Sequence, residues 1–244
     1  MPTDEHNLPE NQPVVKEKIM TSSEQNRSFQ LSGLKRPDVI TSKTKQRAIF
    51  VRDASVSMDD DDKARDASTA TQNFLAELAR PENKDGFYLA VIDFAKIAEV
   101  SVPFARATEL EGSLSEISTS YYTNITAGLA KARELLDEAD DSLDSSEQFL
   151  KPVVILFTDG GHNTGCQPYK ESEQLKQIAD IVCVAFGSDA DLDLLRQIAS
   201  SPEHCYRCQD GHDLRAFMAA VGSTLSESIR AGIDATQPLA EINK

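Results

Sequence analysis

The sequence predicts an α/β fold, a doubly wound and mainly parallel six-stranded sheet with helices on both faces. Two observations lead to this prediction. Short runs of consecutive apolar residues alternate along the chain with stretches in which apolar residues recur at helical spacing. Continuous apolar strands are typical of parallel sheets that are buried on both faces, and helices between them provide the crossover connections. In addition, the segment 97–102 alternates apolar and polar residues, as an edge strand does.

The elements are expected in order from Arg47 onward. The expected strands are 48–51, 87–92, 97–102, 153–157, 181–186 and 204–208. The expected helices are 64–78, 108–117, 125–136, 169–179, 191–200 and 214–225. In such sheets, binding sites form at the carboxyl ends of the strands, near the point where the strand order reverses.

Three segments differ in composition. Residues 1–46 are polar and rich in proline and are expected to form a flexible arm, residues 47–230 to form the folded domain, and residues 231–244 to form a tail. Residues 1–47 carry eight basic and six acidic side chains, whereas the remainder carries 17 basic and 34 acidic ones. The folded domain is therefore strongly acidic.

Composition excludes several classes of function. The net charge of −15 argues against nucleic acid as a partner, because binding to phosphates depends on clustered cations. No apolar run approaches the roughly 20 residues that cross a bilayer, so no membrane association is expected. The first 20 residues lack a basic start followed by an apolar stretch, so no secretory signal is visible and a cytoplasmic location is expected.

Oxygen-bearing side chains cluster in three loops that follow a predicted strand or open a predicted helix. Asp53, Ser55 and Ser57 follow the first strand, Thr123 precedes the helix at 125–136, and Asp159 follows the strand at 153–157. Together they offer two carboxylates and three hydroxyls, which are hard ligands that suit Mg²⁺, and also Mn²⁺ or Ca²⁺. Two carboxylates only offset the charge of the ion, so it could still accept a carboxylate from a partner.

A simpler interpretation remains open for each loop by itself. Serine, threonine and aspartate after strands often form turns or cap helices and bind nothing. Thr123 could both cap the helix that follows it and reach an ion.

The three loops, taken in this order, resemble the von Willebrand factor A domain and its metal-ion-dependent adhesion site. That family has D-x-S-x-S, then a distant Thr, then an Asp after its fourth strand. Asp53, Ser55, Ser57, Thr123 and Asp159 fill all five positions, and the resemblance covers roughly residues 47–230. It implies a Rossmann-like sheet whose edge strand at 97–102 is antiparallel.

The resemblance also implies a function. The domain would be a non-catalytic module that binds a divalent ion, and a carboxylate from a partner protein would complete the coordination sphere. Tyr121, Tyr122 and His162 would form part of the rim that contacts the partner. The sequence looks most similar to bacterial intracellular members of the tellurite-resistance TerY type, which would imply a role in stress response.

An acidic run follows the first loop. Integrin β subunits, which belong to the same superfamily, have D-x-S-x-S-M-x-D-D, in which the acidic pair supplies an adjacent metal site. This spacing assigns Asp60 and Asp61 to the pair. The alternative is a solvated acidic first turn that interacts favourably with the helix dipole.

Two other kinds of chemistry are weighed against this hypothesis. His204, Cys205 and Cys208 have a spacing reminiscent of zinc sites, but two cysteines at an odd offset on a strand point to opposite faces.

A Mg²⁺-dependent phosphatase or phosphotransferase could use Asp53 as its nucleophile, as haloacid-dehalogenase-like enzymes do. Those enzymes have a second Asp two residues later, where this chain has Ser55, and no lysine stands convincingly in the matching loops.

Overall fold

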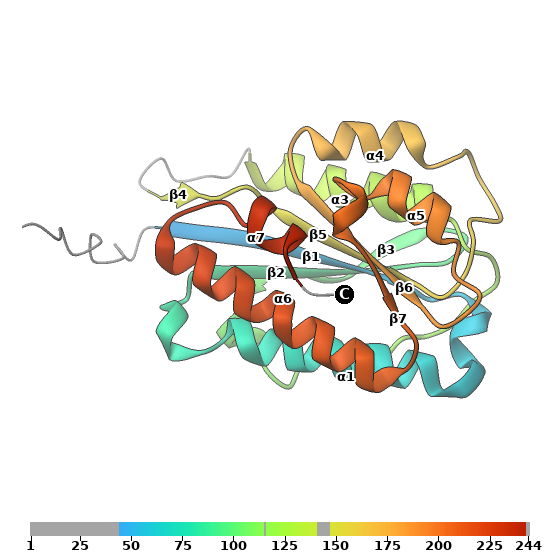
Figure 1. Ribbon diagram of the computed structural model, residues 1–244, viewed down its shortest axis with the longest axis horizontal. Coiled ribbons are helices and arrows are strands. Elements are labelled where there is room, and N and C mark those ends of the chain that lie inside the picture. The colour runs from blue at the N-terminus through green and yellow to red at the C-terminus, as the bar shows by residue number, and fades with distance from the viewer. Residues whose placement is uncertain (1–43, 115, 141–146, 243–244) are drawn as a thin grey trace, which may run out of the picture. The chain divides into compact units, whose positions relative to one another are not determined.

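The computed structural model describes residues 44–114, 116–140 and 147–242 of the 244-residue chain. These residues form a seven-stranded sheet between two layers of helices (Figure 1). The strands are β1 (Thr44–Asp53), β2 (Phe87–Phe94), β3 (Ala98–Arg106), β4 (Gln148–Phe149), β5 (Val153–Thr158), β6 (Asp180–Phe186) and β7 (Cys205–Cys208). None of the helices in the described part is long and apolar enough to cross a membrane.

The strand order is β3-β2-β1-β5-β6-β7, and the short strand β4 pairs with the start of β1. Among these described strands, β2 and β3 are antiparallel and the other pairs are parallel. The prediction of a mainly parallel sheet with one antiparallel edge strand is confirmed. The six strands on the main path correspond to the six predicted ones, and β4 is an addition of two residues.

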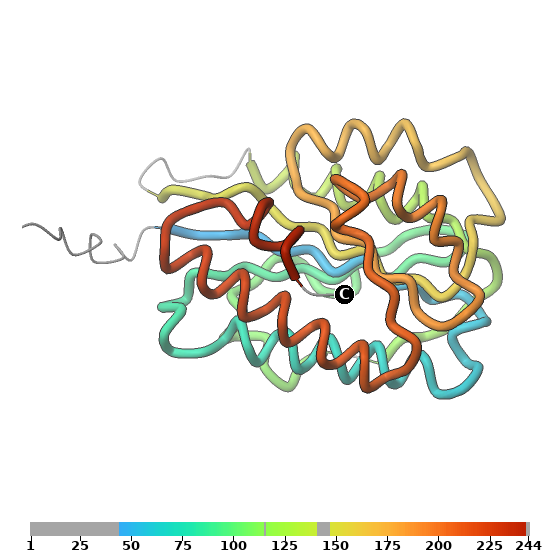
Figure 2. The backbone as a smooth tube through the Cα atoms, viewed as in Figure 1, coloured from blue at the N-terminus to red at the C-terminus, as the bar shows by residue number. Residues whose placement is uncertain are grey.

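Helices cover both faces of the sheet, as the smooth backbone trace also shows (Figure 2). One face carries α1 (Lys63–Leu78), α2 (Ala107–Leu110), α6 (Gly211–Ala231) and α7 (Thr236–Ala240). The other face carries α3 (Ile125–Asp140), α4 (Tyr169–Lys176) and α5 (Leu192–Ile198). Short 3₁₀ turns lie at Val56–Asp62, Pro81–Asn83 and Pro202–His204.

Strand β1 shows why its apolar run is continuous. Successive side chains of a strand point to opposite faces. Ala48 and Phe50 accordingly lie in the core beneath α1 and α6, whereas Ile49 and Val51 lie in the core beneath α3. Both layers of helices therefore require apolar residues from this one strand.

The strand order reverses between β1 and β5. From β1 the chain builds outward through β2 and β3, and it then returns to the other side of β1 and builds outward through β5, β6 and β7. The carboxyl ends of β1 and β5 are adjacent, because Arg52 pairs with Phe157 across the two strands. The loops that begin at Asp53 and Asp159 therefore open at the place where sheets of this kind bind ligands.

The predicted helix at 108–117 is wrong in its extent, because α2 ends at Leu110. Gly112 has a φ of 75°, a left-handed conformation that a continuing right-handed helix cannot contain. Leu114 and Ile117 are nevertheless buried. Their apolar spacing therefore reflects packing of a loop on the core, and not a helical face.

The structure also refines the two ends of the domain. Strand β1 begins at Thr44, so the last three residues of the predicted arm belong to the sheet, and residues 1–43 lie outside the described residues. In the predicted tail, Ala235 and Leu239 are buried in the core that contains α6. The described tail therefore packs against the domain through α7 and the residue before it.

Helix α3 approaches the sheet closely at Gly128. A β-carbon at this position would lie 2.9 Å from Cγ1 of Val51 and 3.1 Å from Cδ1 of Phe94. We expect Gly128→Val to lower the free energy of unfolding by about 1–3 kcal/mol, because the added carbons overpack this contact. Urea denaturation would measure the loss. Glu138→Val places the same side chain on the exposed face of α3, and an equal loss in this control would contradict the explanation.

Candidate metal centre

The three loops identified in the sequence lie at the same edge of the sheet. The N–H of Ala54 donates to the carbonyl of Phe94 over 2.7 Å, and the N–H of Ser120 donates to the carbonyl of Ala54 over 2.8 Å. Ser55 and Ser120 also form an isolated parallel bridge. Backbone hydrogen bonds therefore hold the loop before α3 against the loop that follows β1.

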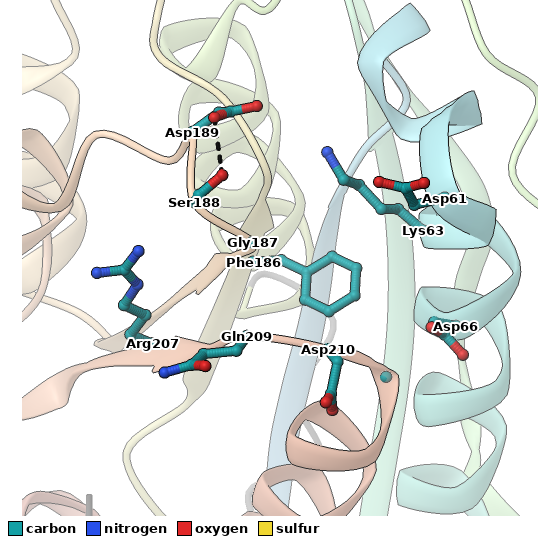
Figure 3. Close-up of a pocket in the computed structure, with 11 residues that line it drawn as sticks. Asp61, Lys63, Asp66, Phe186, Gly187, Ser188, Asp189, Arg207, Gln209 and Asp210 are labelled. Atoms are coloured by element: carbon teal, nitrogen blue, oxygen red, sulfur yellow. Dashed lines mark hydrogen bonds between the residues drawn. The ribbon is translucent and has the colours of Figure 1, made fainter.

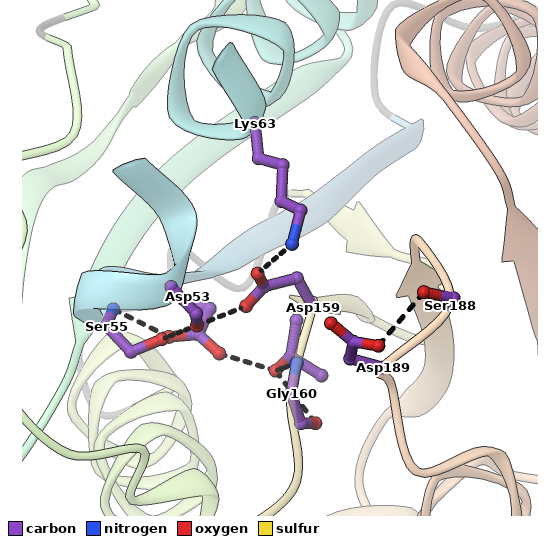
Figure 4. A network of polar contacts seen from close by, with 9 residues as sticks. Asp53, Ser55, Lys63, Asp159, Gly160, Ser188 and Asp189 are labelled. Atoms are coloured by element: carbon purple, nitrogen blue, oxygen red, sulfur yellow. Dashed lines mark hydrogen bonds and ion pairs between the residues drawn. The ribbon is translucent and has the colours of Figure 1, made fainter. Parts of the chain in front are cut away.

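Four of the five predicted ligands form one chain of contacts (Figure 4). The N–H of Ser55 donates to Oδ1 of Asp53 over 2.8 Å, and the hydroxyl oxygens of Ser55 and Ser57 lie 3.0 Å apart. The Ser57 hydroxyl donates to Oδ1 of Asp159 over 2.8 Å. The structure thus connects Asp53 and Asp159, 106 positions apart in the sequence, through Ser55 and Ser57.

Thr123 lies in the neighbouring loop and is also buried. Its N–H donates to Oδ1 of Asn163 over 2.8 Å, and its carbonyl accepts from the N–H of Asn163 over 3.1 Å. Among the described residues, no hydrogen bond joins the Thr123 hydroxyl to the other four predicted ligands. Instead, the hydroxyl of Thr158 donates to Oδ2 of Asp53. Sequence reasoning missed this contact, although Thr158 stands directly before the predicted ligand Asp159.

A lysine completes the cluster. The ammonium nitrogen of Lys63 lies 2.8 Å from Oδ2 of Asp159, and both side chains are largely or wholly withdrawn from solvent. Lys63 is the first residue of α1, and the chain turns toward the site through left-handed conformations at Asp61 and Asp62, with φ values of 52° and 58°. The sequence offered no lysine in the loops that a phosphotransferase would use, and Lys63 reaches Asp159 from the first residue of α1 instead. In the sequence, Lys63 is the first basic residue after Arg52, at the end of four consecutive aspartates.

Burial raises the pKa of Asp53 to about 6, and the nearby Asp159 carboxylate adds to the rise, although hydrogen bonds from Thr158 and Ser55 oppose it. Two buried carboxylates, three hydroxyls and one ammonium group therefore share a small volume. The carboxylate and hydroxyl oxygens fit a hard divalent cation, which prefers oxygen ligands and would stabilise the ionised form of Asp53.

The predicted rim residues differ in their environments. Tyr121 and Tyr122 are 72% and 52% exposed, and Val56 from the first loop is 46% exposed. Tyr122 has a φ of 77°, which is unfavourable for a bulky residue, and the Lys96 ammonium lies 5.7 Å from the centre of its ring. Apolar side chains from two loops are thus presented to solvent beside the cluster.

His162 has a structural contact that the sequence did not reveal. Its Nδ1 accepts a hydrogen bond from the N–H of Ile125 over 3.2 Å, at the first residue of α3. Burial lowers the pKa of the His162 imidazole, which favours the neutral ring that this bond requires. His162 therefore satisfies a free N–H at the helix start, and its contact with a partner stays a prediction.

The acidic pair and the cysteines were also considered in the sequence. Asp60 and Asp61 are exposed, and they lie at the kink before α1 and not within a regular helical turn. A second ion at this pair stays a prediction. Cys205 packs in the core beneath α5 and Cys208 in the core beneath α6, so the prediction that the two point to opposite faces is confirmed.

The raised pKa of Asp53 has a measurable consequence for stability. The pKa is 3.8 in the unfolded chain and about 6 in the folded one, so the folded protein binds more protons between these values. Without a metal ion, stability should therefore fall as the pH rises from about 4 to about 6. We expect Asp53→Asn to be more stable than the native protein above pH 6 in EDTA, by at most about 3 kcal/mol.

Chemical denaturation in EDTA at pH 4 and at pH 8 would measure this difference. Glu138→Gln, a neutralised exposed acid on α3, serves as the control and should show little change at either pH. A less stable Asp53→Asn variant at pH 8 would show that burial of the carboxylate carries no such cost.

Comparison with known proteins supports the fold described above. The model of the von Willebrand factor type A domain matches residues 49–220. No curated protein matches the chain. One solved structure is proximal thread matrix protein 1 from the mussel byssus, with a zinc-occupied MIDAS (metal-ion-dependent adhesion site) motif. It is 26% identical with a TM-score of 0.59, over 77% of this chain and 47% of that one.

Two microbial structures show the same fold at lower identity. A von Willebrand factor type A protein from Catenulispora acidiphila is 20% identical with a TM-score of 0.59, over 74% of this chain and 42% of that one. The ArnB paralog VWA2 from Sulfolobus acidocaldarius is 18% identical with a TM-score of 0.55, over 74% of this chain and 46% of that one. The chain spans a little less than half the length of each of these three solved structures.

The segment matched by the family model begins in β1 and ends in α6. It contains the sheet's switch point and all three loops of the candidate metal centre. The chain therefore belongs to the von Willebrand factor type A domain family.

Proposed function

We propose that this domain binds a protein partner through a divalent metal ion held by Asp53, Ser55, Ser57, Thr123 and Asp159. Domains of this family are generally metal-dependent protein-interaction modules, and are typically non-enzymatic. The observation that carries the proposal is the chain of contacts from Asp53 to Asp159 through the N–H of Ser55 and the hydroxyls of Ser55 and Ser57, with both carboxylates withdrawn from water.

The carboxylates and the hydroxyls would play different roles in holding the ion. The carboxylates of Asp53 and Asp159 would balance the double charge of the ion, and the hydroxyls would contribute donor oxygens without further charge. When bound, the ion supplies a positive coordination position for a carboxylate from the partner. Hydrogen bonds at Ser55 and Thr158 hold the Asp53 carboxylate in place from two sides.

The exposed side chains around the centre support contact with a protein. Val56, Tyr121 and Tyr122 present apolar surface from two of the three loops. Aromatic residues provide large contact areas at low cost in side-chain entropy and are enriched in protein interfaces. We infer that they pack against residues flanking the partner's carboxylate.

The acidic character of the domain favours a particular kind of association. The chain carries a net charge of −15, so it repels acidic partners at a distance. Salt screens exposed charges over about 8 Å at physiological ionic strength, so direct coordination can dominate at contact. Association with a carboxylate-bearing partner should therefore be slow and sensitive to salt.

The finer assignments belong to the same proposal. Mg²⁺ is the ion we favour, with Mn²⁺ or Ca²⁺ as alternatives. Because the related byssus protein has zinc in its MIDAS motif, the identity of the metal should be measured directly.

We propose a cytoplasmic location and a stress-response role from the TerY-like resemblance. A phosphotransferase using Asp53 remains the alternative, and Ser55 occupies the place of the acid that such an enzyme needs. Phosphatase turnover that is lost in Asp53→Asn would favour that alternative.

We expect Mg²⁺ or Mn²⁺ to raise the melting temperature of the protein, because a ligand that binds the folded state selectively stabilises it. When the free ion concentration is 100 times the Kd, binding raises the free energy of unfolding by about 2.7 kcal/mol. Ser57→Ala should reduce this gain, since it removes a donor oxygen that also links the two halves of the site. Ser188→Ala, which removes an exposed hydroxyl outside the donor set, should keep it. A melting temperature that is unchanged by every divalent ion would contradict the proposal.

We expect partner proteins captured on the immobilised domain to be released by excess EDTA and to be absent when Asp53→Ala is used as bait. Tyr121→Ala should weaken capture while leaving the metal-induced rise in melting temperature intact, because Tyr121 lies on the exposed rim. Quantitative mass spectrometry of the eluates would measure both effects. Capture that persists unchanged in EDTA would count decisively against binding through the ion.

A further inference from the structure

The contact between Lys63 and Asp159 joins the helix that follows the first loop to a predicted metal ligand. The ammonium nitrogen lies 2.8 Å from Oδ2 of Asp159 (Figure 4). The side chain of Asp159 is 0% exposed and that of Lys63 is 14% exposed. Both carboxylate oxygens of Asp159 are engaged, because its Oδ1 accepts the hydroxyl proton of Ser57.

A divalent ion and Lys63 therefore require the same group. A buried carboxylate needs a nearby positive charge. Moving a carboxylate out of water costs free energy, and a buried carboxylate with no cation beside it costs more still. In this structure, Lys63 supplies that charge. An ion bound between Asp53 and Asp159 would supply two positive charges at the same place, and the ammonium group would then be repelled.

The surroundings of Lys63 offer another place for the ammonium group. Lys63 lines an open cleft of about 570 Å³ beside the candidate metal centre. Asp61 and Lys63 lie on one side of this cleft, and Asp189 lies on the opposite side (Figure 3). The charges of Asp189 and Asp60 already act on the Lys63 ammonium. A β-carbon at Gly187 would lie 3.7 Å from Cε of Lys63, so the glycine leaves space beside the side chain.

We propose that Lys63 is a built-in competitor of the metal ion, which neutralises Asp159 in the metal-free domain and must leave it when the ion binds. This proposal rests on the proposed function. Lys63 thereby sets the affinity of the site, because each binding event includes the loss of a buried ion pair. The domain then binds metal, and with it a partner, only above a concentration of ion that Lys63 determines.

The test is calorimetric titration of Mn²⁺ into the full chain and its variants at physiological salt. Lys63→Met keeps most of the length of the side chain but removes its charge, and we expect it to tighten the Kd roughly tenfold, a change equal to about 1.4 kcal/mol. Lys63→Gln is a second neutral variant that can still donate a hydrogen bond to Asp159, and it should change the Kd in the same direction. Lys63→Arg keeps the charge and should keep the Kd close to the native value.

Arg65→Met is the matched control. Arg65 is exposed on the same turn of α1, so this variant also removes one positive charge near the site but leaves the Lys63–Asp159 pair in place. It should alter the Kd much less than Lys63→Met does. Melting in EDTA provides a second readout, because Lys63→Met should be less stable than the native protein without metal and should gain more from Mn²⁺.

The outcomes separate the two proposals. Native protein that binds Mn²⁺, with a Kd that Lys63→Met and Lys63→Gln leave unchanged or weaken, would overturn the role of Lys63 and leave the metal site standing. A weakened Kd would show that Lys63 positions Asp159 for the ion and does not compete with it. Failure of the native protein and of all variants to bind any divalent ion would overturn both proposals.

Discussion

The burial of two carboxylates at one edge of a parallel sheet is the constraint on which the rest of this structure depends. Asp53 ends β1, and Asp159 follows β5, the strand that pairs with β1. The reversal of strand order at this pair of strands brings both acids to the edge of the sheet where such folds bind ligands. Two such groups withdrawn from water need positive charge and hydrogen-bond donors close by.

The structure meets this requirement in two ways. Neutral donors reach the carboxylates from the hydroxyls of Ser57 and Thr158 and from the N–H of Ser55. Positive charge reaches Asp159 from Lys63, while burial still raises the pKa of Asp53 to about 6. The chain's own cation thus stabilises one carboxylate more directly than the other. That asymmetry is the physical reason to expect the site to accept a further cation, and to expect Lys63 to oppose it.

The sequence predicted the parts of the fold and site that depend on local pattern. Buried strands such as β5 are continuous apolar runs, and Asp53, Ser55, Ser57 and Asp159 follow such runs directly, so their meeting at one edge followed from parallel strand geometry. Lys63 could not be predicted in this way, because its approach to Asp159 depends on left-handed turns at Asp61 and Asp62, two residues of an acidic run that looks like a solvated helix start. The helix at 108–117 was wrong because apolar spacing alone does not distinguish a helix from a loop packed on the core. The contact of His162 with α3 depends on the path of a long loop, which local pattern does not encode.

The account depends on a divalent ion lying between the loops that follow β1 and β5. A crystal structure of the domain soaked in Mn²⁺, with anomalous scattering recorded, tests this most directly. We expect an anomalous peak within bonding distance of oxygens from Asp53, Ser55, Ser57, Thr123 and Asp159, with the Lys63 ammonium moved away from Asp159. Well-ordered loops with no peak between them, and Lys63 still paired with Asp159 at high Mn²⁺ concentration, would contradict the account.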